Sequence, residues 1–399
     1  MARKTVVIYF PRLGVPLYTH EKLTLSAVAK AIARINDDEF AGCCDKARHH
    51  DHNDIFFVPS DALILNEASE LGIHSPAGLF GAIVPYPFVK TKAITHRLVN
   101  GRADRPEGWS SGFAQRVRRA ALPGFTAFSA HDARLAAAAG LQAHGAIRLK
   151  DPLGDGGHGQ TVITSPNALN EMLENYPEEK LATHGLVLEM NLRRAVTLSV
   201  GQITVGDLVI AYHGTQRTVT NNHGRSVYGG SRLVCVRGGW EALEDLPISP
   251  ETRLAIAQAR SYDQAAAEYP GFLATRRNYD VGQGIDEEGR WRSGVFEASW
   301  RSGGASTAEL AALSEFAQDP VVQVVEASAV KEFGRDRKIP PGSVVHFQGD
   351  DPEDGPLLRY TVVTRRGTQP SLHFANGKRC ARVGNLGVMP TSKKQSCGR

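Results

Sequence analysis

The stretch AIRLKDPLGDGGHGQTVI, residues 146–163, decides the fold that we expect for this chain. A short apolar run ends in Lys150, a loop with four glycines follows, and Gln160–Ile163 begins a second apolar run. This pattern predicts a strand, a tight loop and a returning strand. Glycines lack a Cβ atom, so their backbone N–H groups can approach an anion closely, and the lysine adds a positive charge. We therefore predict a phosphate-binding loop that suits a triphosphate.

Two other kinds of phosphate loop do not match this stretch. A Walker A loop has its lysine after the glycines and continues into a helix, whereas Lys150 precedes the glycines and a β-rich segment follows them. The dinucleotide-binding motif also needs a helix directly after its loop. A surface hairpin rich in glycine, with no ligand, is the simpler alternative.

The order of lysine, glycine loop and strand resembles the ATP-grasp superfamily. Four more segments resemble elements of that family in its order, over residues 85–310: TKAITHRLV at 91–99, LPGF at 122–125, LVLEMNL at 186–192, and the acidic pair formed by YD at 279–280 and VFEASWR at 295–301. Within the superfamily, the chain looks closest to an uncharacterised proteobacterial family with this core, which supplies no substrate. The resemblance implies a fold of the α/β (α+β) class, in which a small N-terminal α/β domain precedes two α+β subdomains that clamp ATP.

The chain divides into four parts on this reading. Residues 1–88 alternate strand-like and helix-like segments, with a helix expected at 61–71, and form the N-terminal α/β domain. Residues 89–185 form the nucleotide subdomain with the glycine-rich loop, and within it we expect a loop at 100–115 and helices that begin at Ser129 and Ser165. Residues 186–335 form the subdomain with the hinge and the metal-binding strands, in which the pattern of residues 320–332 fits either a strand or a short helix. Residues 336–399 form a C-terminal extension, whose basic, turn-rich end we expect to be disordered.

The resemblance also implies which residues bind ATP. Lys150 would contact the α- and β-phosphates, and Lys92 would be a second phosphate lysine, with Lys90 as a nearby competitor. Glu189 would accept a hydrogen bond from the adenine amino group or bind the ribose, and the backbone near Leu192 would contact adenine. The glycines that would cradle the phosphates are Gly154, Gly156, Gly157 and Gly159.

The acidic residues of two predicted strands are candidate magnesium ligands. Mg²⁺ prefers carboxylate oxygens and keeps some of its water, and carboxylates on adjacent antiparallel strands can converge on one ion. The resemblance assigns Asp280 and Glu297 to this role, and Asp286 is a rival to Asp280. The third ligand of the family is an asparagine, and Ser299 occupies its place here. A hydroxyl is a weaker ligand, so the number of magnesium ions stays open.

Two basic segments are candidates for contacts to substrate. Arg301 precedes a glycine pair, and in the family an arginine here helps to bind the transferring phosphoryl group or an acyl phosphate. Residues 214–225 read as a polar loop between β segments, in which Arg217, His223 and Arg225 are candidates. A turn with a surface arginine is the alternative for Arg301, and an ordinary long hairpin loop is the alternative for residues 214–225.

Composition fits an enzyme of two or three domains. The chain has 399 residues, of which 42% are hydrophobic and 22% charged, and a formal net charge of +4 that does not suggest a nucleic-acid binder. No apolar run reaches the ~18 residues of a membrane span. Five cysteines without CxxC spacing favour a reduced, cytoplasmic setting. We expect small-molecule substrates, no nucleic acid and no membrane, and a homodimer stays open.

Together these features predict an enzyme that uses ATP and Mg²⁺ in ligase-type chemistry. In the usual ATP-grasp reaction a carboxylate is activated as an acyl phosphate, and an amine or another nucleophile then displaces phosphate. Alternatives are a phosphotransferase or carboxylase on the same core, or a nucleotide-binding protein of this fold without ligase chemistry. Loop-built substrate pockets do not identify the acceptor or the donor.

Overall fold

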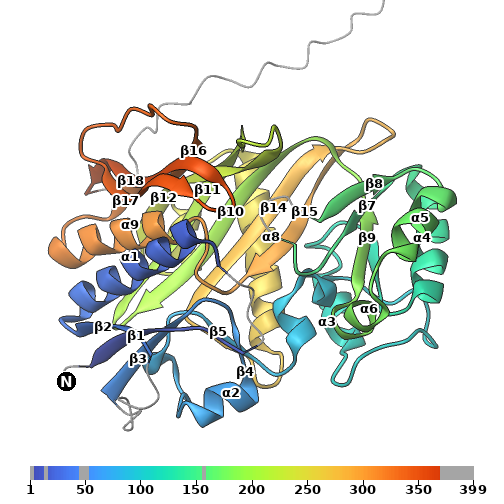
Figure 1. The fold of residues 1–399 in the computed structure, drawn as a ribbon, viewed down its shortest axis with the longest axis horizontal. Coiled ribbons are helices and arrows are strands. Elements are labelled where there is room, and N and C mark those ends of the chain that lie inside the picture. The colour runs from blue at the N-terminus through green and yellow to red at the C-terminus, as the bar shows by residue number, and fades with distance from the viewer. Residues whose placement is uncertain (1–3, 13–16, 45–53, 155–158, 369–399) are drawn as a thin grey trace, which may run out of the picture.

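A computed structural model describes residues 4–12, 17–44, 54–154 and 159–368. These residues mix helices with four β-sheets, which confirms the expected α/β class. The largest sheet has eight strands, in the order β15-β14-β10-β11-β12-β16-β18-β17, and a separate sheet of four strands has the order β6-β9-β7-β8. Figure 1 shows the two sheets side by side, with the N-terminal elements below and beside the larger one.

The bounds of the elements follow the chain. The strands are β1 Thr5–Tyr9, β2 Glu39–Cys43, β3 Ile55–Pro59, β4 Leu63–Ile64, β5 Ala82–Val84, β6 Gly124–Ala127, β7 Ile147–Lys150, β8 Gln160–Ile163, β9 Leu186–Met190, β10 Arg193–Val205, β11 Leu208–Thr220, β12 Ser226–Arg237, β13 Leu273–Ala274, β14 Arg276–Ile285, β15 Trp291–Ser299, β16 Val324–Phe333, β17 Val344–Asp351 and β18 Gly355–Gly367. The α-helices are α1 Thr19–Asn36, α2 Leu65–Glu70, α3 Ser111–Val117, α4 Ala130–His144, α5 Pro166–Glu174, α6 Glu178–His184, α7 Trp240–Glu244, α8 Pro250–Ala267 and α9 Ser306–Gln318.

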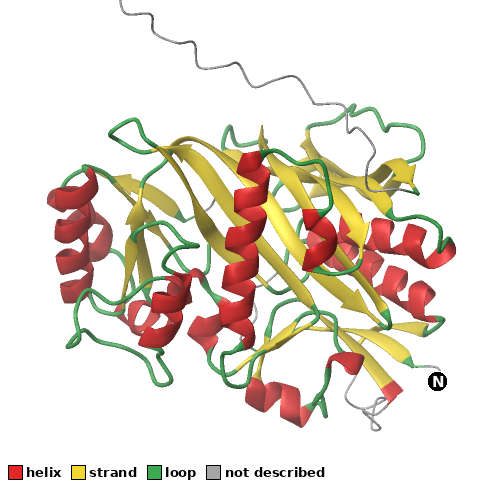
Figure 2. Cartoon of the chain, turned by 180° about the vertical axis from the view of Figure 1, so that it is seen from behind, coloured by secondary structure: helices red, strands yellow, loops and turns green. Residues whose placement is uncertain are grey.

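The eight-stranded sheet is covered on both faces, so its strands alternate between two hydrophobic cores. Tyr279 and Val281 of β14 pack in the core that includes α8, which crosses the sheet in Figure 2. Ile210 and Tyr212 of β11 pack in the core that includes α1 and α9. Side chains two positions apart on a strand share a face. The even-numbered residues of β14 therefore face away from α8.

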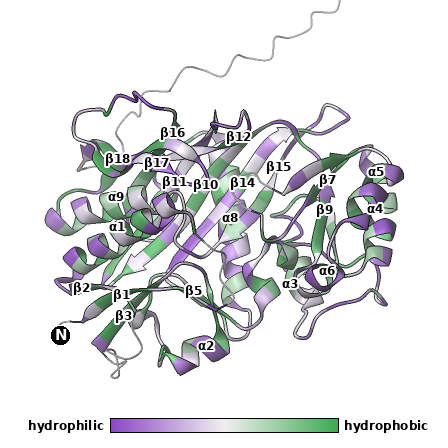
Figure 3. Ribbon diagram, in the orientation of Figure 1, coloured by the Kyte–Doolittle hydropathy of each residue, from purple (hydrophilic) through white to green (hydrophobic). Residues whose placement is uncertain are grey.

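The four-stranded sheet is antiparallel and is covered by α4 and α5. Its core contains apolar side chains of β7 and β9 together with alanines of α4. Ser129 and Ser165 accept hydrogen bonds from the backbone N–H groups of Asp132 and Ala168, which satisfies otherwise unpaired donors at the two helix starts. The predicted helices after these two serines are thus confirmed. In Figure 3 the sheet-facing sides of the helices are apolar and the outer sides are polar.

Several expectations need correction. The predicted helix at 61–71 is shorter and is α2, because Leu63–Ile64 pairs with β5 as a strand. The predicted loop at 100–115 ends in α3, which begins at Ser111. Residues 320–332, left open between strand and helix, contribute to β16. The strands β17 and β18 were missed, and both belong to the eight-stranded sheet. Gly156, Gly157 and the end of the chain after position 368 lie outside the described residues.

Candidate functional site

A cleft of about 460 Å³ lies where the two sheets and the start of α1 approach one another. Strands β7 and β8 of the smaller sheet supply Lys150 and Gln160, and β14 and β15 of the larger sheet supply Asp280 and Glu297. Other lining residues that the argument uses are Lys92, Tyr228, Arg276, Asn278, Ser299, Arg301, Lys331 and Arg359. The cleft thus brings together predicted site residues that are up to about two hundred positions apart in the sequence.

Lys150 ends β7 and lies almost completely buried at the edge of the cleft. Its Nζ atom forms an ion pair with Glu189 of β9 and lies 4.4 Å from the centre of the Phe296 ring. His96 Nε2 contacts the other oxygen of Glu189 at 3.2 Å. Burial by itself would raise the pKa of Glu189, but Lys150 and His96 outweigh it and hold that pKa below its usual value. Lys150 and Glu189 are predicted to bind different parts of ATP, and in the structure their side chains contact each other.

Lys92 approaches the cleft from the segment that precedes the small sheet. The segment Lys92–Thr95 is a 3-10 helix, and the Thr91 side chain caps it by accepting a hydrogen bond from the N–H of Ala93. The Lys92 ammonium lies 3.1 Å from Glu297 Oε2 and also donates to the carbonyl of Gly154. The competitor Lys90 pairs with Asp61 at 2.6 Å and does not line the cleft. Of the two lysines, the geometry therefore favours Lys92 as the candidate second phosphate lysine.

The base of the glycine loop is held by backbone hydrogen bonds. The N–H of Asp151 donates to the carbonyl of Gly159 at 2.8 Å, and the N–H of Gly154 donates to the carbonyl of Asp151 at 3.1 Å. Gly159 has a φ of +69°, and a Cβ atom on it would lie 2.9 Å from Cβ of Asp151. Glycine is therefore required at position 159 for the loop to close in this way.

The hinge strand ends in an apolar cluster beside the lysines. Leu192 is buried with Leu122 and Met190, and the ring of Phe296 packs against the three. Neither Leu192 nor Glu189 lines the cleft. Their predicted contacts to adenine and ribose stay predictions.

Asp280 and Glu297 are direct cross-strand partners on β14 and β15. Asp280 accepts hydrogen bonds from Asn278 Nδ2 at 2.9 Å and from Ser199 Oγ at 3.2 Å. Burial, and then the charge of Glu297, raise the pKa of Asp280 above its usual value. Its hydrogen-bond donors are neutral, and no cation among the described residues forms a salt bridge with this carboxylate, which faces a second carboxylate. The site is chemically suited to a divalent cation.

The rival carboxylate Asp286 has a different role. It lies at the tip of the β14–β15 hairpin and accepts hydrogen bonds from the backbone N–H groups of Glu288 and Arg290 and from the side chains of Arg290 and Arg292. Although burial opposes it, these contacts hold the pKa of Asp286 well below its usual range. Asp286 does not line the cleft. These contacts stabilise the turn, and the surroundings of Asp286 do not support a role as a metal ligand.

Ser299 lies opposite Asn278 on the paired strands, and both line the cleft. Asn278 accepts a hydrogen bond from the Tyr212 hydroxyl at 3.0 Å and donates to Asp280. In the described part of the chain, no cluster of three or more histidine, cysteine, aspartate or glutamate side chains is placed to hold a metal ion. An ion here would have two carboxylate ligands, and water or phosphate oxygens would complete its shell, as Mg²⁺ tolerates.

The loop that carries Arg301 is fixed by a buried ion pair. Arg276 Nε and NH2 donate to Glu309 at 2.8 and 2.7 Å, and both residues are almost fully buried. Burial alone would lower the pKa of Arg276, and the Glu309 carboxylate outweighs it and raises that pKa. Arg276 NH1 also donates to the carbonyls of Ser299 and Arg301. The pair therefore positions the backbone of the two predicted site residues.

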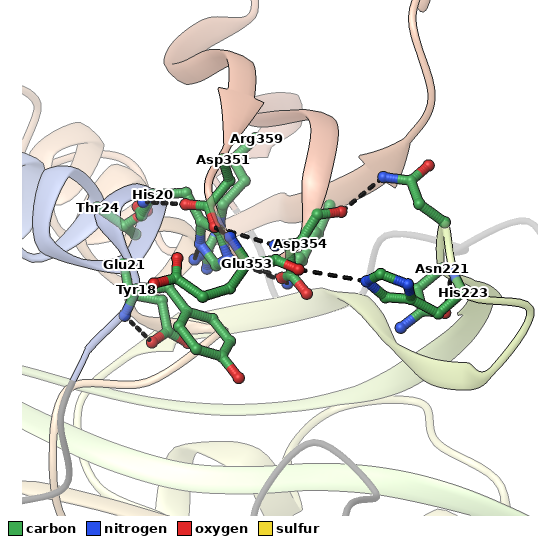
Figure 4. A network of polar contacts seen from close by, with 12 residues as sticks. Tyr18, His20, Glu21, Thr24, Asn221, His223, Asp351, Glu353, Asp354 and Arg359 are labelled. Atoms are coloured by element: carbon green, nitrogen blue, oxygen red, sulfur yellow. Dashed lines mark hydrogen bonds and ion pairs between the residues drawn. The ribbon is translucent and has the colours of Figure 1, made fainter.

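The far end of the cleft is formed by α1, β16 and β18, and Figure 4 shows the polar network behind it. The predicted loop at 214–225 is much shorter, since β11 runs to Thr220 and β12 starts at Ser226. His223 Nε2 lies 3.2 Å from the carbonyl of Glu353, in the turn between β17 and β18. Arg217, His223 and Arg225 do not line the cleft.

Sequence reasoning missed several lining residues. Arg276 and Asn278 share the alternation that places Asp280 on one face of β14, and this pattern could have found them. Tyr228, Lys331 and Arg359 carry no local motif, because strands far apart in the sequence bring them to the cleft.

The chain belongs to the family described as "Protein of unknown function (DUF3182)", whose profile matches residues 15–361. The proteobacterial origin expected for its nearest family stays a prediction. No curated protein matches the chain. In the described residues, no helix is both long and apolar enough to cross a membrane.

Solved structures of low sequence identity align over most of the chain. N5-carboxyaminoimidazole synthetase from Staphylococcus aureus, complexed with ADP, is 11% identical with a TM-score of 0.49, and the alignment covers 91% of this chain and 93% of that one. The biotin carboxylase domain of the Hydrogenobacter thermophilus 2-oxoglutarate carboxylase, in complex with MgADP, ADP and bicarbonate, is 12% identical with a TM-score of 0.49, covering 90% and 86%. D-alanine–D-alanine ligase from Bacillus anthracis is 10% identical with a TM-score of 0.43, covering 75% and 88%.

Proposed function

We propose that this chain is an ATP-grasp enzyme that binds ATP and Mg²⁺ in the cleft and activates a carboxylate as an acyl phosphate. One observation carries the proposal: Lys92 and Lys150 meet the paired carboxylates Asp280 and Glu297 in a single cleft. Cations suited to phosphate oxygens thus lie beside carboxylates suited to Mg²⁺, which is the combination that phosphoryl transfer requires.

The residues have separate roles in this proposal. Lys150, Lys92 and the backbone of the glycine loop hold the phosphates, and the apolar cluster around Leu192 adjoins the adenine. Asp280 and Glu297 would hold Mg²⁺, which would offset the charge that develops on the phosphate oxygens. In the structure, Lys92 neutralises Glu297 across 3.1 Å. If Glu297 held Mg²⁺, Lys92 would be available to a phosphate.

The proposed reaction has two steps. An oxygen of the substrate carboxylate attacks the γ-phosphorus, the bond to the β-phosphate oxygen breaks, and ADP leaves with that electron pair. An amine or another nucleophile then attacks the acyl carbon and releases inorganic phosphate. Arg301 would orient the transferring phosphoryl group, since a planar guanidinium matches its oxygens. Positioning and neutralisation of charge supply most of the rate. We expect small-molecule substrates and a cytoplasmic enzyme.

A nucleotide-binding protein without transfer chemistry is the second candidate. It is favoured by Ser299, which offers a neutral hydroxyl where a third metal ligand is expected. In that case ATP would bind with Mg²⁺, but no acceptor would be phosphorylated.

Calorimetric titration of the full chain with ATP in the presence of Mg²⁺ tests the nucleotide part of the proposal. Phosphate release, measured with a panel of carboxylic acids and amines, tests the chemistry. Saturable ATP binding with release that depends on an added carboxylic acid is the expected result. Absence of ATP binding would contradict both candidates, and binding without any stimulated release would favour the second.

A further inference from the structure

The far end of the cleft contains an almost buried arginine that has no salt-bridge partner among the described residues. Arg359 is 9% exposed and lines the cleft from β18. No carboxylate among the described residues forms a salt bridge with it. Its NH1 group donates instead to His20 Nδ1 at 2.9 Å. A buried charge normally has an ionic partner.

His20 orients this arginine without neutralising it. Its Nε2 atom lies 3.0 Å from Asp354 Oδ2, so the neutral ring donates there and accepts from Arg359 at Nδ1. Burial, and then the charges of Arg359 and Lys331, lower the pKa of His20 to about 4, which keeps the ring neutral at pH 7. Asp351 holds the backbone of His20 through a hydrogen bond of 3.1 Å, which fixes α1 to the β17–β18 turn (Figure 4).

The described carboxylates near this cluster contact groups other than Arg359. Lys331 Nζ lies 2.7 Å from Asp354 Oδ2, in a pair whose side chains are both mostly buried. The Glu21 carboxylate accepts from the backbone N–H of Tyr18 at 3.0 Å. Burial is also the main reason that the pKa of Arg359 is lowered, as expected for a cation that lacks a close counter-charge.

Neutral donors complete the surroundings of Arg359. The Tyr228 hydroxyl lies 2.7 Å from Ser231 Oγ, and both side chains line the cleft. Burial raises the pKa of Tyr228 to about 12, so its phenol stays protonated and can donate. A Cβ atom on Gly304 would lie 2.3 Å from the Tyr228 ring, so glycine at this position lets the Arg301 loop approach Tyr228.

We propose that Arg359, with Lys331 and Tyr228, forms an anion subsite for a second acidic group of the acceptor substrate, a carboxylate or a phosphate. The inference rests on the proposed function, because the first acidic group is the carboxylate that is phosphorylated near Arg301. The substrate class is therefore a small acid with two anionic groups. A planar guanidinium binds both kinds of group through paired hydrogen bonds.

The test uses two probes, succinate for a carboxylate and inorganic phosphate for a phosphate. The full chain is titrated calorimetrically with each probe at constant ionic strength, with Mg²⁺ and a saturating non-hydrolysable ATP analogue. Saturable binding of at least one probe, weakened about tenfold or more in Arg359→Gln, is expected, since a charge-assisted contact is lost. The probe that binds more tightly identifies the kind of acidic group. Arg366→Gln is the matched control, because Arg366 lies on the same strand outside the cleft and pairs with Glu315 at 2.8 Å.

A second measurement on the unmodified chain does not depend on how the variants fold. Phenylglyoxal modifies arginines, and peptide mass spectrometry reports which ones react. The tighter probe should protect Arg359 and leave Arg366 unchanged. Absence of saturable binding for both probes, equal affinity in Arg359→Gln, or modification of Arg359 that no probe slows would each overturn the subsite. Failure of the ATP analogue to bind would contradict the proposed function instead.

Discussion

Strand β14 and the turn that follows it carry two carboxylates of opposite electrostatic character. Asp286, in the turn, is surrounded by two arginines and by backbone N–H groups, so the pKa of its carboxyl is lowered. Asp280, six positions earlier, has neutral donors and a facing Glu297, so its pKa is raised. The charge of Asp286 stabilises the fold, whereas the charge of Asp280 does not. An anion kept without a counter-charge in a cleft is expected at a binding site rather than at a structural one.

The tip of the hairpin also has a structural partner in the hinge. Arg193 NH2 donates to the carbonyl of Asp286 at 3.0 Å, and Asn191 Nδ2 donates to Glu287 Oε1 at 3.0 Å. Through these contacts the tip joins the larger sheet to the end of β9. Asp280 and Glu297, farther from the tip, line the cleft.

The largest effect is expected for Glu297→Gln. The amide keeps the shape of the side chain but removes the charge through which Glu297 is proposed to bind Mg²⁺, so turnover with saturating substrates should fall about a hundredfold or more. Asp286→Asn is the matched control and should keep wild-type turnover. Steady-state phosphate release, with circular dichroism to confirm folding, is the measurement. A folded Glu297→Gln protein that keeps most of its activity would contradict the proposed difference between the cleft carboxylates and Asp286.

Removal of Lys150 should weaken ATP binding about ten- to a hundredfold, because a charge-assisted contact to phosphate is lost. Lys150→Ala also leaves Glu189 buried without its main cation, which should destabilise the fold. The double variant Lys150→Met with Glu189→Gln removes both charges, and it should recover stability but not affinity. Calorimetry and thermal unfolding measure the two properties. If the double variant regains affinity for ATP, then Lys150 only neutralises Glu189 and does not contact a phosphate.

Asp286→Asn should lower the urea midpoint of unfolding at pH 7. A lowered pKa in the folded state means that Asp286 contributes stability above its unfolded pKa of about 3.9. That contribution disappears as the pH falls through the pKa of the folded state. The difference between wild type and variant should therefore be constant from pH 5 to 7 and should shrink below about pH 4. A difference that does not change with pH would assign the effect to packing rather than to charge.

The smallest effect is expected for Ser299→Asn. If Ser299 faces the metal, an amide oxygen should raise the affinity for Mg²⁺ by a few-fold, because a carbonyl is a better ligand for a hard cation than a hydroxyl. Turnover as a function of Mg²⁺ concentration measures this. A lower maximal rate with unchanged Mg²⁺ dependence would show that Ser299 faces substrate.

The sequence predicts residues that local patterns bring to the cleft, and it does not predict those that distant strands bring there. The lysine at the end of β7, the glycine loop and the alternation in β14 are local signals with a direct physical meaning. The pairing of Asp280 with Glu297 follows from the hairpin between them. Arg359 could not be predicted, because the alternation of β18 is weak and the strand reaches the cleft only after β16 pairs with β12. The contact between Lys150 and Glu189 depends on the register of β7 against β9, which no local pattern determines.

The most direct test of the central claim measures two properties of Asp280→Asn and Asp286→Asn. These are the free energy of unfolding at pH 7 without nucleotide, and the Mg²⁺-dependent affinity for ATP. A raised pKa means that the ionised Asp280 opposes folding at pH 7, so Asp280→Asn should be as stable as wild type or more stable and should lose Mg²⁺-dependent ATP binding. Asp286→Asn should be less stable and should bind ATP as wild type does. A less stable Asp280→Asn protein that still binds ATP with the wild-type dependence on Mg²⁺ would contradict the account.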